Sequence, residues 1–195
     1  HIADVATQVD IDSELDKYAQ KRASNLYLPE QTIHMLPPNL SSLCSLGESD
    51  RSSALSVGFR MINCEISDIK ILQSEIKVVK LSYEEADKAL KKDELLSKLN
   101  AITKSHKAFR NDNGAIKLDL PNVDVKLKNK KVNIHIQTES ASRKLVAEMM
   151  VIAGRAIAQY ANENKISMPF LTQEVGSFSE DIMQNKENLT ATQAF

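Results

Sequence analysis

Cysteine is scarce in this sequence, which contains only Cys44 and Cys64. Their wide spacing matches neither a disulfide framework nor a zinc motif. Because disulfides persist mainly in oxidising compartments, both residues are expected to be ordinary buried thiols in a reducing compartment. The expected location is therefore the cytoplasm or, alternatively, the interior of an organelle.

Long hydrophobic runs and an excess of one charge are missing too. The longest nearly apolar run, from Leu145 to Ala153, is far shorter than the roughly 20 residues that a bilayer requires, and Glu148 interrupts it. No part of the sequence is therefore expected to span a membrane. With 25 basic and 26 acidic residues, bulk charge gives no reason to expect nucleic-acid or membrane binding. A site for a polyanion would have to be a local patch.

Several catalytic motifs are absent. The sequence has no Gly-rich phosphate loop and no pairing of a nucleophile with a base. The alternating carboxylates from Asp10 to Asp16 suggest a calcium loop, but Leu15 and Lys21 stand where that loop needs glycine and glutamate. His34 has no nucleophile nearby in the sequence and is interpreted as a surface residue.

What remains is an ordinary composition, with 42% apolar and 26% charged residues in 195 positions. It predicts a soluble globular domain of the α+β class with a sizeable core. Alternation predicts a strand over residues 1–9. Asp12 or Ser13 is expected to cap a helix that turns Leu15 and Ala19 toward the core.

The stretch from Ser24 to Leu46 contains Pro29 and the pair Pro37-Pro38. Proline removes a backbone donor and forces the preceding residue into an extended conformation. We therefore predict an extended loop pinned to a core rather than a regular helix.

Alternation over residues 53–82 predicts two or three antiparallel strands with a hairpin turn at Asn63. Ser82 is expected to cap a helix, and a second helix is expected from about Asp93 to a stop before Gly114. One stripe of that second helix should face the core; it comprises Leu95, Leu99, Ile102, His106 and Phe109. His106 is interpreted as a packed residue rather than a ligand.

Short strands are predicted over residues 115–120, 123–129 and 131–138. A basic run at the expected hairpin tip is a solvated turn or, alternatively, a phosphate contact; it comprises Lys126, Lys128, Lys130 and Lys131. The longest helix is expected from Ser140 to Asn164 as a central, mostly buried element. Its wide apolar face comprises Leu145, Val146, Met149, Met150, Ile152, Ala153, Ala156, Ile157 and Tyr160.

Several segments, taken together and in order, carry a family resemblance. They are HIADVATQV, SELDKYAQKRASNLYLPEQTIHMLPPNLSSLCSL, IKVVKLSYEEADKAL, FRNDNGAIKLDLP and SRKLVAEMMVIAGRAIAQYANENKISMPF. This series resembles the catalytic (RNB) domain of the ribonuclease II and ribonuclease R family. The resemblance implies a partial RNB-type domain over residues 1–173, with antiparallel strands packed around one long buried helix. Residues 174–195 are expected to form a polar, weakly structured end.

The resemblance also implies an activity. The family consists of processive exoribonucleases that hydrolyse single-stranded RNA from its 3' end to 5'-mononucleotides, with Mg²⁺ held by clustered aspartates. Those aspartates precede the HIAD-like strand in the family, and a Ser-Pro-arginine motif lies beyond the long helix. Because the sequence opens at His1, the aspartates are expected to lie outside it, and the Ser-Pro-arginine motif is missing after the long helix. The chain by itself is therefore expected to be inactive and to hold no metal. Asp4 is expected to be structural, since one carboxylate is too few ligands for such ions.

Substrate contacts can be carried over residue by residue. Tyr27 matches a family tyrosine that stacks on a base near the RNA 3' end, although packing on Pro29 or Met35 is the alternative. Tyr83 matches a tyrosine that helps to hold the 3' nucleotide and to favour RNA over DNA, with a core role at the helix start as the alternative.

Glu148 matches the second of two adjacent family glutamates, and Ala147 replaces the first, which takes part in sugar selection. A simple ion pair of Glu148 with Lys144 or Arg155 is the alternative. Asp12 stands where the family usually has glycine and is expected to alter only a turn.

The expected partner is the 3' end of single-stranded RNA, bound by a monomeric parent protein without a small-molecule cofactor. The alternative function is a non-catalytic RNB-like scaffold that binds RNA or protein.

Overall fold

The computed structural model describes residues 1–115, 123–128, 131–136 and 140–171. The chain forms two compact units, the first made of residues 1–82 and 125–134 and the second of residues 83–124 and 135–195. Helices and antiparallel strands are both present, which confirms the predicted α+β class.

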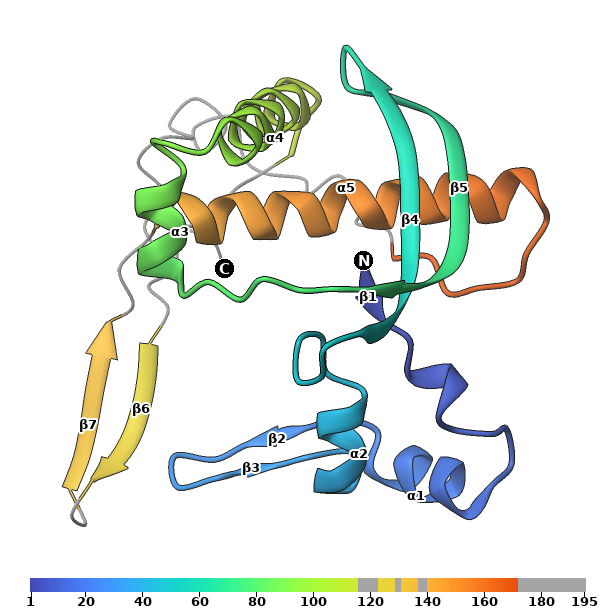
Figure 1. Ribbon diagram of the computed structural model, residues 1–195, viewed down its shortest axis with the longest axis vertical. Coiled ribbons are helices and arrows are strands. Elements are labelled where there is room, and N and C mark those ends of the chain that lie inside the picture. Colours follow the sequence, from blue (N-terminus) through green and yellow to red (C-terminus); the bar gives the residue numbers. More distant parts are fainter. Residues whose placement is uncertain (116–122, 129–130, 137–139, 172–195) are drawn as a thin grey trace, which may run out of the picture. The chain divides into compact units, whose positions relative to one another are not determined.

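The first unit contains a three-stranded antiparallel sheet in the order β1 (Ile2–Ala3), β4 (Ser52–Ile62) and β5 (Glu65–Ile76) (Figure 1). The strand predicted over residues 1–9 is wrong beyond Ala3, because Val5–Thr7 forms a 3₁₀ helix. The chain turns there because the Thr7 hydroxyl donates to the carbonyl oxygen of Asp4 at 2.8 Å. Pairing with β4 thus ends one residue after β1, where the Asp4 amide donates to the Ser53 carbonyl.

The predicted hairpin turn at Asn63 is confirmed. Asn63 and Cys64 join β4 to β5 with φ of 50° and 65°, a two-residue turn whose backbone suits the twist of the strands. The register shifts between Gly58 and Arg60, and the paired strands curve strongly (Figure 1). Residues 77–82, predicted as strand, lie outside regular structure because β5 ends at Ile76.

Helix α1 (Glu14–Arg22) begins at the predicted cap, with the Ser13 hydroxyl accepting from the Asp16 amide at 3.1 Å. Ala19 is buried and Leu15 half-buried, as predicted. Asp12 has a φ of 62°, a left-handed conformation that glycine adopts without strain and aspartate tolerates. Its amide donates to Asp16 at 2.9 Å, which helps to hold the turn.

The stretch from Ser24 to Leu46 differs from the predicted extended loop. It contains a short hairpin of β2 (Leu26–Tyr27) and β3 (Thr32–Ile33), followed by helix α2 (Pro38–Leu43). Pro38 does not prevent the helix because it occupies the first turn, where its missing amide has no partner to lose. Residues 21–32 are all exposed, so this part is not pinned to a core.

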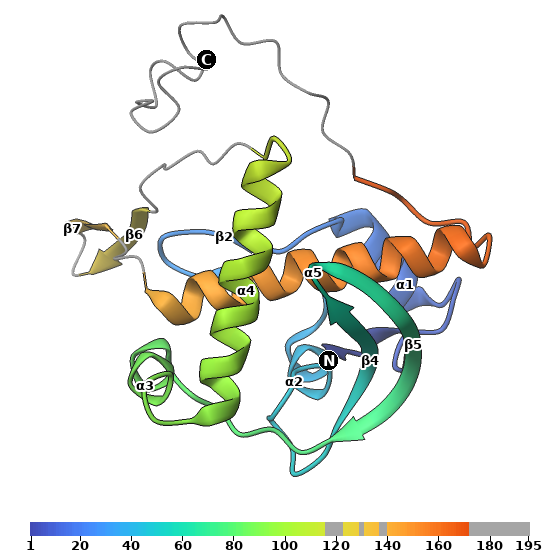
Figure 2. The same cartoon turned by 90° about the horizontal axis from the view of Figure 1, so that it is seen from above.

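The second unit is built from α3 (Tyr83–Ala89), α4 (Glu94–Asp112) and α5 (Ala141–Glu163). The predicted helix starts near Asp93 and Ser140 are confirmed, and the side chains of these two residues accept from the amides of Leu96 and Arg143 as caps. Helix α4 crosses α5, and α3 lies near the beginning of α5 (Figures 1 and 2).

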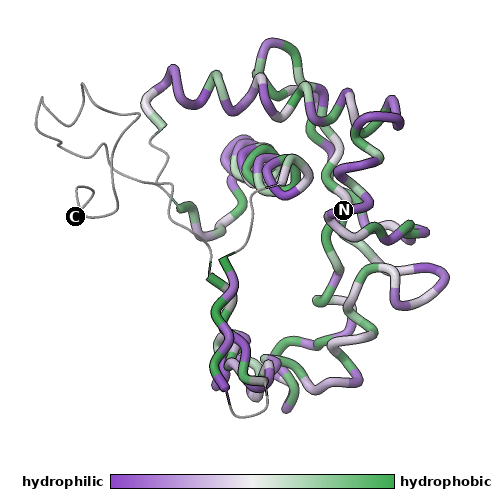
Figure 3. Tube along the Cα trace, turned by 90° about the vertical axis from the view of Figure 1, so that its left-hand side faces the viewer, coloured by the Kyte–Doolittle hydropathy of each residue, from purple (hydrophilic) through white to green (hydrophobic). Residues whose placement is uncertain are grey.

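Only part of the stripe predicted to face the core on α4 is buried. Leu95, Ile102 and Phe109 remain exposed, whereas Thr103 and His106 are buried. Both α4 and α5 mix hydrophilic and hydrophobic residues along their turns (Figure 3). His106 is completely buried, which confirms that it is a packed residue.

Helix α5 has the predicted ends, but its apolar face is only partly covered by described residues. Ile152 and Ala156 are buried, whereas Val146 and Met150 are exposed, so the prediction that they widen a buried face is wrong. Glu148 is buried instead, and its carboxylate is hydrogen-bonded to a side chain of α4, Arg110. Among the described residues, no helix is both long and apolar enough to cross a membrane.

A hairpin of β6 (Val123–Lys128) and β7 (Lys131–Ile136) confirms the paired strands predicted there. Lys126 and Lys131 on it are exposed. The strand predicted over residues 115–120 falls almost entirely outside the described residues, as do Lys130 and the predicted polar end over 174–195.

Candidate nucleic-acid interface

Tyr27 lies on the β2–β3 hairpin of the first unit, opposite Thr32. The Leu28 amide donates to the Gln31 carbonyl at 2.9 Å and closes the loop around Pro29. The Asn25 side chain ties the strands together, because its Oδ1 accepts from the Met35 amide at 2.7 Å. This side-chain hydrogen bond thus stabilises a hairpin whose strands are only two residues long.

The ring of Tyr27 faces solvent. The residue is 75% exposed, so little of it packs on Pro29 or Met35 among the described residues. Its hydroxyl accepts a long hydrogen bond of 3.4 Å from the Asn25 amide group. The hairpin tip is attached to β6, since the Leu127 amide donates to the Pro29 carbonyl at 3.3 Å. An exposed aromatic ring on an anchored hairpin can stack on a planar ligand such as a nucleobase.

Tyr83 begins α3 in the second unit and is 39% exposed. The guanidinium carbon of Arg143 lies 4.0 Å from its ring centroid, so one face of the ring carries a cation. The Ser142 hydroxyl donates to the Tyr83 carbonyl at 3.1 Å and attaches α3 to the start of α5. The backbone of Tyr83 is therefore attached to the start of α5, while part of its ring remains accessible to solvent.

Asp87 completes this attachment. Its Oδ1 accepts from the Ser142 backbone amide at 2.8 Å, in the first turn of α5. The hydrogen bond from the Ser142 amide is the main cause that lowers the pKa of Asp87, and the side chains of Ser142 and Ser140 and the positive charge of Arg143 lower it further. The Asp87 carboxylate is therefore suited to accept hydrogen bonds from the free amides at the N-terminus of α5.

A second polar group joins α4 to α5; we call it the Glu148 cluster, and it consists of Glu148, His106, Arg110 and Arg155. Glu148 accepts from Arg110 Nε at 2.9 Å and from Arg110 Nη2 at 2.8 Å, a two-pronged ion pair. His106 Nδ1 lies 2.6 Å from Glu148 Oε1. Three hydrogen bonds therefore converge on one buried carboxylate.

His106 also contacts Arg155 on α5. Arg155 Nη1 lies 3.3 Å from His106 Nε2, on the side of the ring opposite to Glu148. The imidazole thus connects Arg155 to the carboxylate, and Arg155 also lies 5.7 Å from the Phe109 ring centroid.

Burial alone would raise the pKa of Glu148, but the hydrogen bonds from Arg110 and His106, together with the charge of these partners, outweigh it and hold the pKa below its ordinary value. The same contact raises the pKa of Arg110. The alternative expected for Glu148, an ion pair with Lys144 or Arg155 on its own helix, stays a prediction. An ion pair is made with Arg110, across to α4.

Sequence reasoning missed Arg110 and Arg143. Arg110 follows His106 by one helical turn, so both occupy one face of α4, and a buried glutamate requires such a donor set. That spacing was an available signal. No sequence signal indicated Arg143, because its position over Tyr83 depends on how α3 packs against α5.

The fit of a metal ion can be tested on the described residues. No group of three or more His, Cys, Asp or Glu side chains among them could hold one. Asp4 accepts from the Gln73 amide group at 3.3 Å, which agrees with the structural role expected for it. The residues present do not fit magnesium, so none of them is assigned to it.

Comparison with known proteins places the chain in a family. The family model of the RNB domain matches residues 1–194. The chain therefore belongs to the RNB domain family, which confirms the resemblance seen in its sequence motifs.

Individual relatives agree. The chain is 31% identical to ribonuclease R of Chlamydia pneumoniae over 99% of its own length and 29% of the relative. It is 34% identical to an uncharacterized ribonuclease of Synechocystis, covering 87% of the chain and 27% of that protein. The chain thus spans less than a third of the length of these curated relatives.

Solved structures share the fold. Mycoplasma genitalium RNase R in complex with ribose methylated single-stranded RNA superimposes with a TM-score of 0.73 and 22% identity, over 99% of this chain and 35% of that one. The apo form of the same enzyme gives a TM-score of 0.70 and 24% identity, over 84% of this chain and 28% of that one.

Proposed function

We propose that this chain forms part of a processive 3' to 5' exoribonuclease that hydrolyses single-stranded RNA to 5'-mononucleotides. Membership of the RNB domain family supports the class, and one structural neighbour, Mycoplasma genitalium RNase R, was solved in complex with single-stranded RNA. The observation that carries the proposal is Tyr27, an aromatic ring that is 75% exposed on a tied hairpin. Burying such a ring in the protein itself would have favoured the scaffold alternative.

In this proposal Tyr27 stacks on a base near the RNA 3' end. Every nucleobase has a flat face, so stacking tolerates any sequence, which is what an enzyme that degrades RNA step by step requires. Base stacking on an aromatic side chain contributes about 1–3 kcal/mol per base. The Asn25 tie and the Pro29 contact hold the ring in place before RNA arrives.

Tyr83 and Arg143 are proposed to hold the 3' nucleotide from the second unit. The accessible part of the Tyr83 ring offers a second stacking face, and Arg143 adds a positive charge beside it. Glu148 is proposed to act indirectly. Its carboxylate is engaged by Arg110 and His106, so it positions the start of α5 rather than reading the sugar itself.

Magnesium is proposed as the metal of the natural-length protein, where it would stabilise the attacking and leaving oxygens. The described residues hold no suitable carboxylate cluster, so the reaction step is not assigned to them. The proposed enzyme is monomeric and cytoplasmic.

The activity is tested on the natural-length protein with single-stranded RNA labelled at its 5' end and with Mg²⁺. The expected result is stepwise shortening from the 3' end with release of 5'-mononucleotides. The 195-residue chain alone is expected to cause no Mg²⁺-dependent loss of RNA. RNA binding by the natural-length protein without any shortening would identify the scaffold instead.

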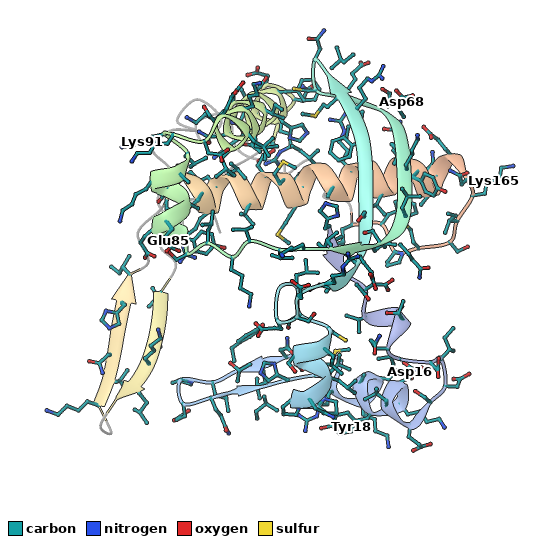
Figure 4. The ribbon with its side chains drawn as sticks, viewed as in Figure 1. Asp16, Tyr18, Asp68, Glu85, Lys91 and Lys165 are labelled. Carbon is teal, nitrogen blue, oxygen red and sulfur yellow. The ribbon has the colours of Figure 1, made fainter. Side chains whose placement is uncertain are left out.

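The stacking role is tested by Tyr27→Ala, with Tyr18→Ala as the matched control. Tyr18 is also a partly exposed tyrosine of the first unit, but it lies on α1 (Figure 4). The guanidinium carbon of Arg22 lies 5.0 Å from its ring centroid. From the stacking energy, Tyr27→Ala should weaken binding of a short labelled RNA by about tenfold. Equal affinities of the two variants, measured by fluorescence anisotropy, would remove Tyr27 from the RNA site.

A further inference from the structure

The last turn of α4 ends in a hydrogen-bonded pattern that favours glycine. The Gly114 amide donates to the Asn111 carbonyl at 3.1 Å. The Ala115 amide donates to the Arg110 carbonyl at 3.0 Å. This pair of bonds is the Schellman motif, which places a residue of positive φ directly after the C-cap. Gly114 fills that position with a φ of +89°, and the C-cap before it is Asn113.

Asn113 is the one asparagine of the sequence that precedes a glycine, since only five glycines are present and no other follows an asparagine. Asn113 is exposed, and its side-chain amide donates to the Phe109 carbonyl at 2.7 Å. The space around Gly114 is open, because a Cβ added there would meet no atom of the described residues within 4 Å. Packing therefore does not separate the Asn113 side chain from the Gly114 nitrogen.

We propose that Asn113 is a site of spontaneous deamidation. The Gly114 nitrogen loses its proton to water and attacks Cγ of Asn113, so a C–N bond forms and closes a cyclic imide. The Cγ–Nδ2 bond breaks, and the side-chain nitrogen leaves as ammonia. Water then opens the imide at either of its carbonyl carbons, which leaves aspartate or isoaspartate. Glycine favours this ring closure because no Cβ hinders the approach of its nitrogen.

Helix α5 provides a matched comparison within the same unit. It also ends in a Schellman motif with an exposed asparagine, Asn164, as its C-cap. The Asn164 side chain donates to the Tyr160 carbonyl at 2.8 Å. The backbone of Asn164 has φ of −95° and ψ of 5°, close to the −94° and 21° of Asn113. The residue that follows is Lys165, with a φ of 54°, so the two helix ends differ in the side chain next to the cap (Lys165 in Figure 4).

The reaction requires a local opening at the end of α4. The Asn113 side chain has to leave the Phe109 carbonyl before its Cγ can approach the nitrogen of Gly114. That amide in turn has to leave the Asn111 carbonyl. All four residues are exposed, and helix ends open at a smaller cost in free energy than core segments do. Deamidation is therefore expected in the folded chain, and it should be faster in the chain unfolded by urea.

Deamidation would change the end of α4. In both products a carboxylate takes the place of the Asn113 amide group, at the negative end of the helix dipole, and the Phe109 carbonyl loses its side-chain donor. Isoaspartate also lengthens the main chain just before the Gly114 amide. The turn that is altered includes Arg110, whose side chain belongs to the Glu148 cluster.

The test incubates the 195-residue chain in native buffer at mildly alkaline pH, in water enriched in heavy oxygen. Digestion at mildly acidic pH stops the reaction, and the peptides are mapped by tandem mass spectrometry. Asn113 should gain the mass of deamidation with one heavy oxygen and should yield isoaspartate as well as aspartate. Asn164 should stay unchanged over the same time. Direct hydrolysis of the amide would give aspartate alone.

Lys165→Gly is the decisive variant, because it gives Asn164 the same neighbour as Asn113 at an equivalent helix end. Glycine adopts the positive φ of position 165 without strain, so the variant should fold. It should deamidate at Asn164 as well as at Asn113. Asn113→Asp, which reproduces one product, should lower the folding equilibrium constant about two- to fivefold in urea unfolding.

The inference is overturned if Asn113 of the wild-type chain gains no more heavy oxygen than Asn164, or if its product is aspartate alone. An unchanged Asn164 in the Lys165→Gly variant would equally overturn the role assigned to glycine. Circular dichroism before incubation shows whether the chain is folded; if it is not, the natural-length protein is mapped in the same way. None of these measurements involves RNA, so their outcome is independent of the proposed function.

Discussion

Replacing Glu148 by glutamine should destabilise the second unit by about 2 kcal/mol. Glutamine keeps the shape of the side chain but loses the negative charge to which Arg110 and His106 donate. A hydrogen bond to a charged group contributes about 1.5–3 kcal/mol. The side chain of Arg110 is 35% exposed and is hydrated again when its partner is lost. The loss of stability is therefore expected near the lower end of that range.

Glu148→Ala should lower stability further, by about 3–5 kcal/mol in total. It also leaves His106 Nδ1, whose residue is 0% exposed, without an acceptor, and an orphaned buried donor costs a further 1–3 kcal/mol or so. The order of stability, wild type above Glu148→Gln above Glu148→Ala, follows from the contacts that each variant retains.

The assay is equilibrium unfolding in urea followed by circular dichroism. Glu163→Gln is the matched control, because Glu163 lies on the same helix but is exposed and accepts from Gln159, one turn back on that helix, at 2.9 Å. Its effect should stay within about 0.5 kcal/mol. If Glu148→Gln and Glu163→Gln have the same small effect, the Glu148 cluster does not hold α4 to α5 and its proposed contribution is refuted.

Two further predictions concern acid and backbone conformation. Because the folded-state pKa of Glu148 is lowered, its stabilisation is fully present above the ordinary pKa of about 4.3 and is lost as pH falls through the folded value. The stability difference between wild type and Glu148→Gln should therefore shrink in urea titrations at decreasing pH, and a constant difference would contradict the ion pair. Gly47→Ala should lower stability by about 1 kcal/mol, since Gly47 has a φ of +79° and a new Cβ would lie 2.9 Å from Lys80 Cε. Gly154→Ala, in α5 with nothing within 4 Å of the new Cβ, should instead raise it by up to about 1 kcal/mol, and equal midpoints for the two variants would refute the distinction.

Local features of the fold were predictable from short stretches of sequence. Ser13, Asp93 and Ser140 cap helices through amides only three residues away, and the turn at Asn63 needs only two residues with positive φ. Such interactions depend on neighbours along the chain, so the residue types indicate them directly.

Features that depend on distant partners were not predictable. The predicted stripe of α4 included Ile102 and Phe109, which are exposed; the helix packs instead through His106 of that stripe and through Thr103 outside it. The reason is Glu148, which is 42 residues from His106 along the chain and provides a buried acceptor that a hydrophobic pattern does not reveal. The N-terminal strand was overestimated for a similar reason, because β4 pairs with only Ile2 and Ala3.

Residues of the candidate site were predictable only where a sequence motif indicated them. The NLYLP motif singled out Tyr27, and the structure adds its exposure and the Asn25 tie. Arg143 and Tyr83 come from separate helices, whose meeting requires tertiary structure.

The most direct test of the central claim, that Tyr27 grips the RNA near its 3' end, is the length of the final product left by the natural-length protein. With 5'-labelled single-stranded RNA resolved to single nucleotides, Tyr27→Ala should leave a longer undigested product than wild type, because the shortened RNA loses its stacking contact earlier. Tyr18→Ala should leave the wild-type product. Identical end products for Tyr27→Ala and wild type would contradict the claim.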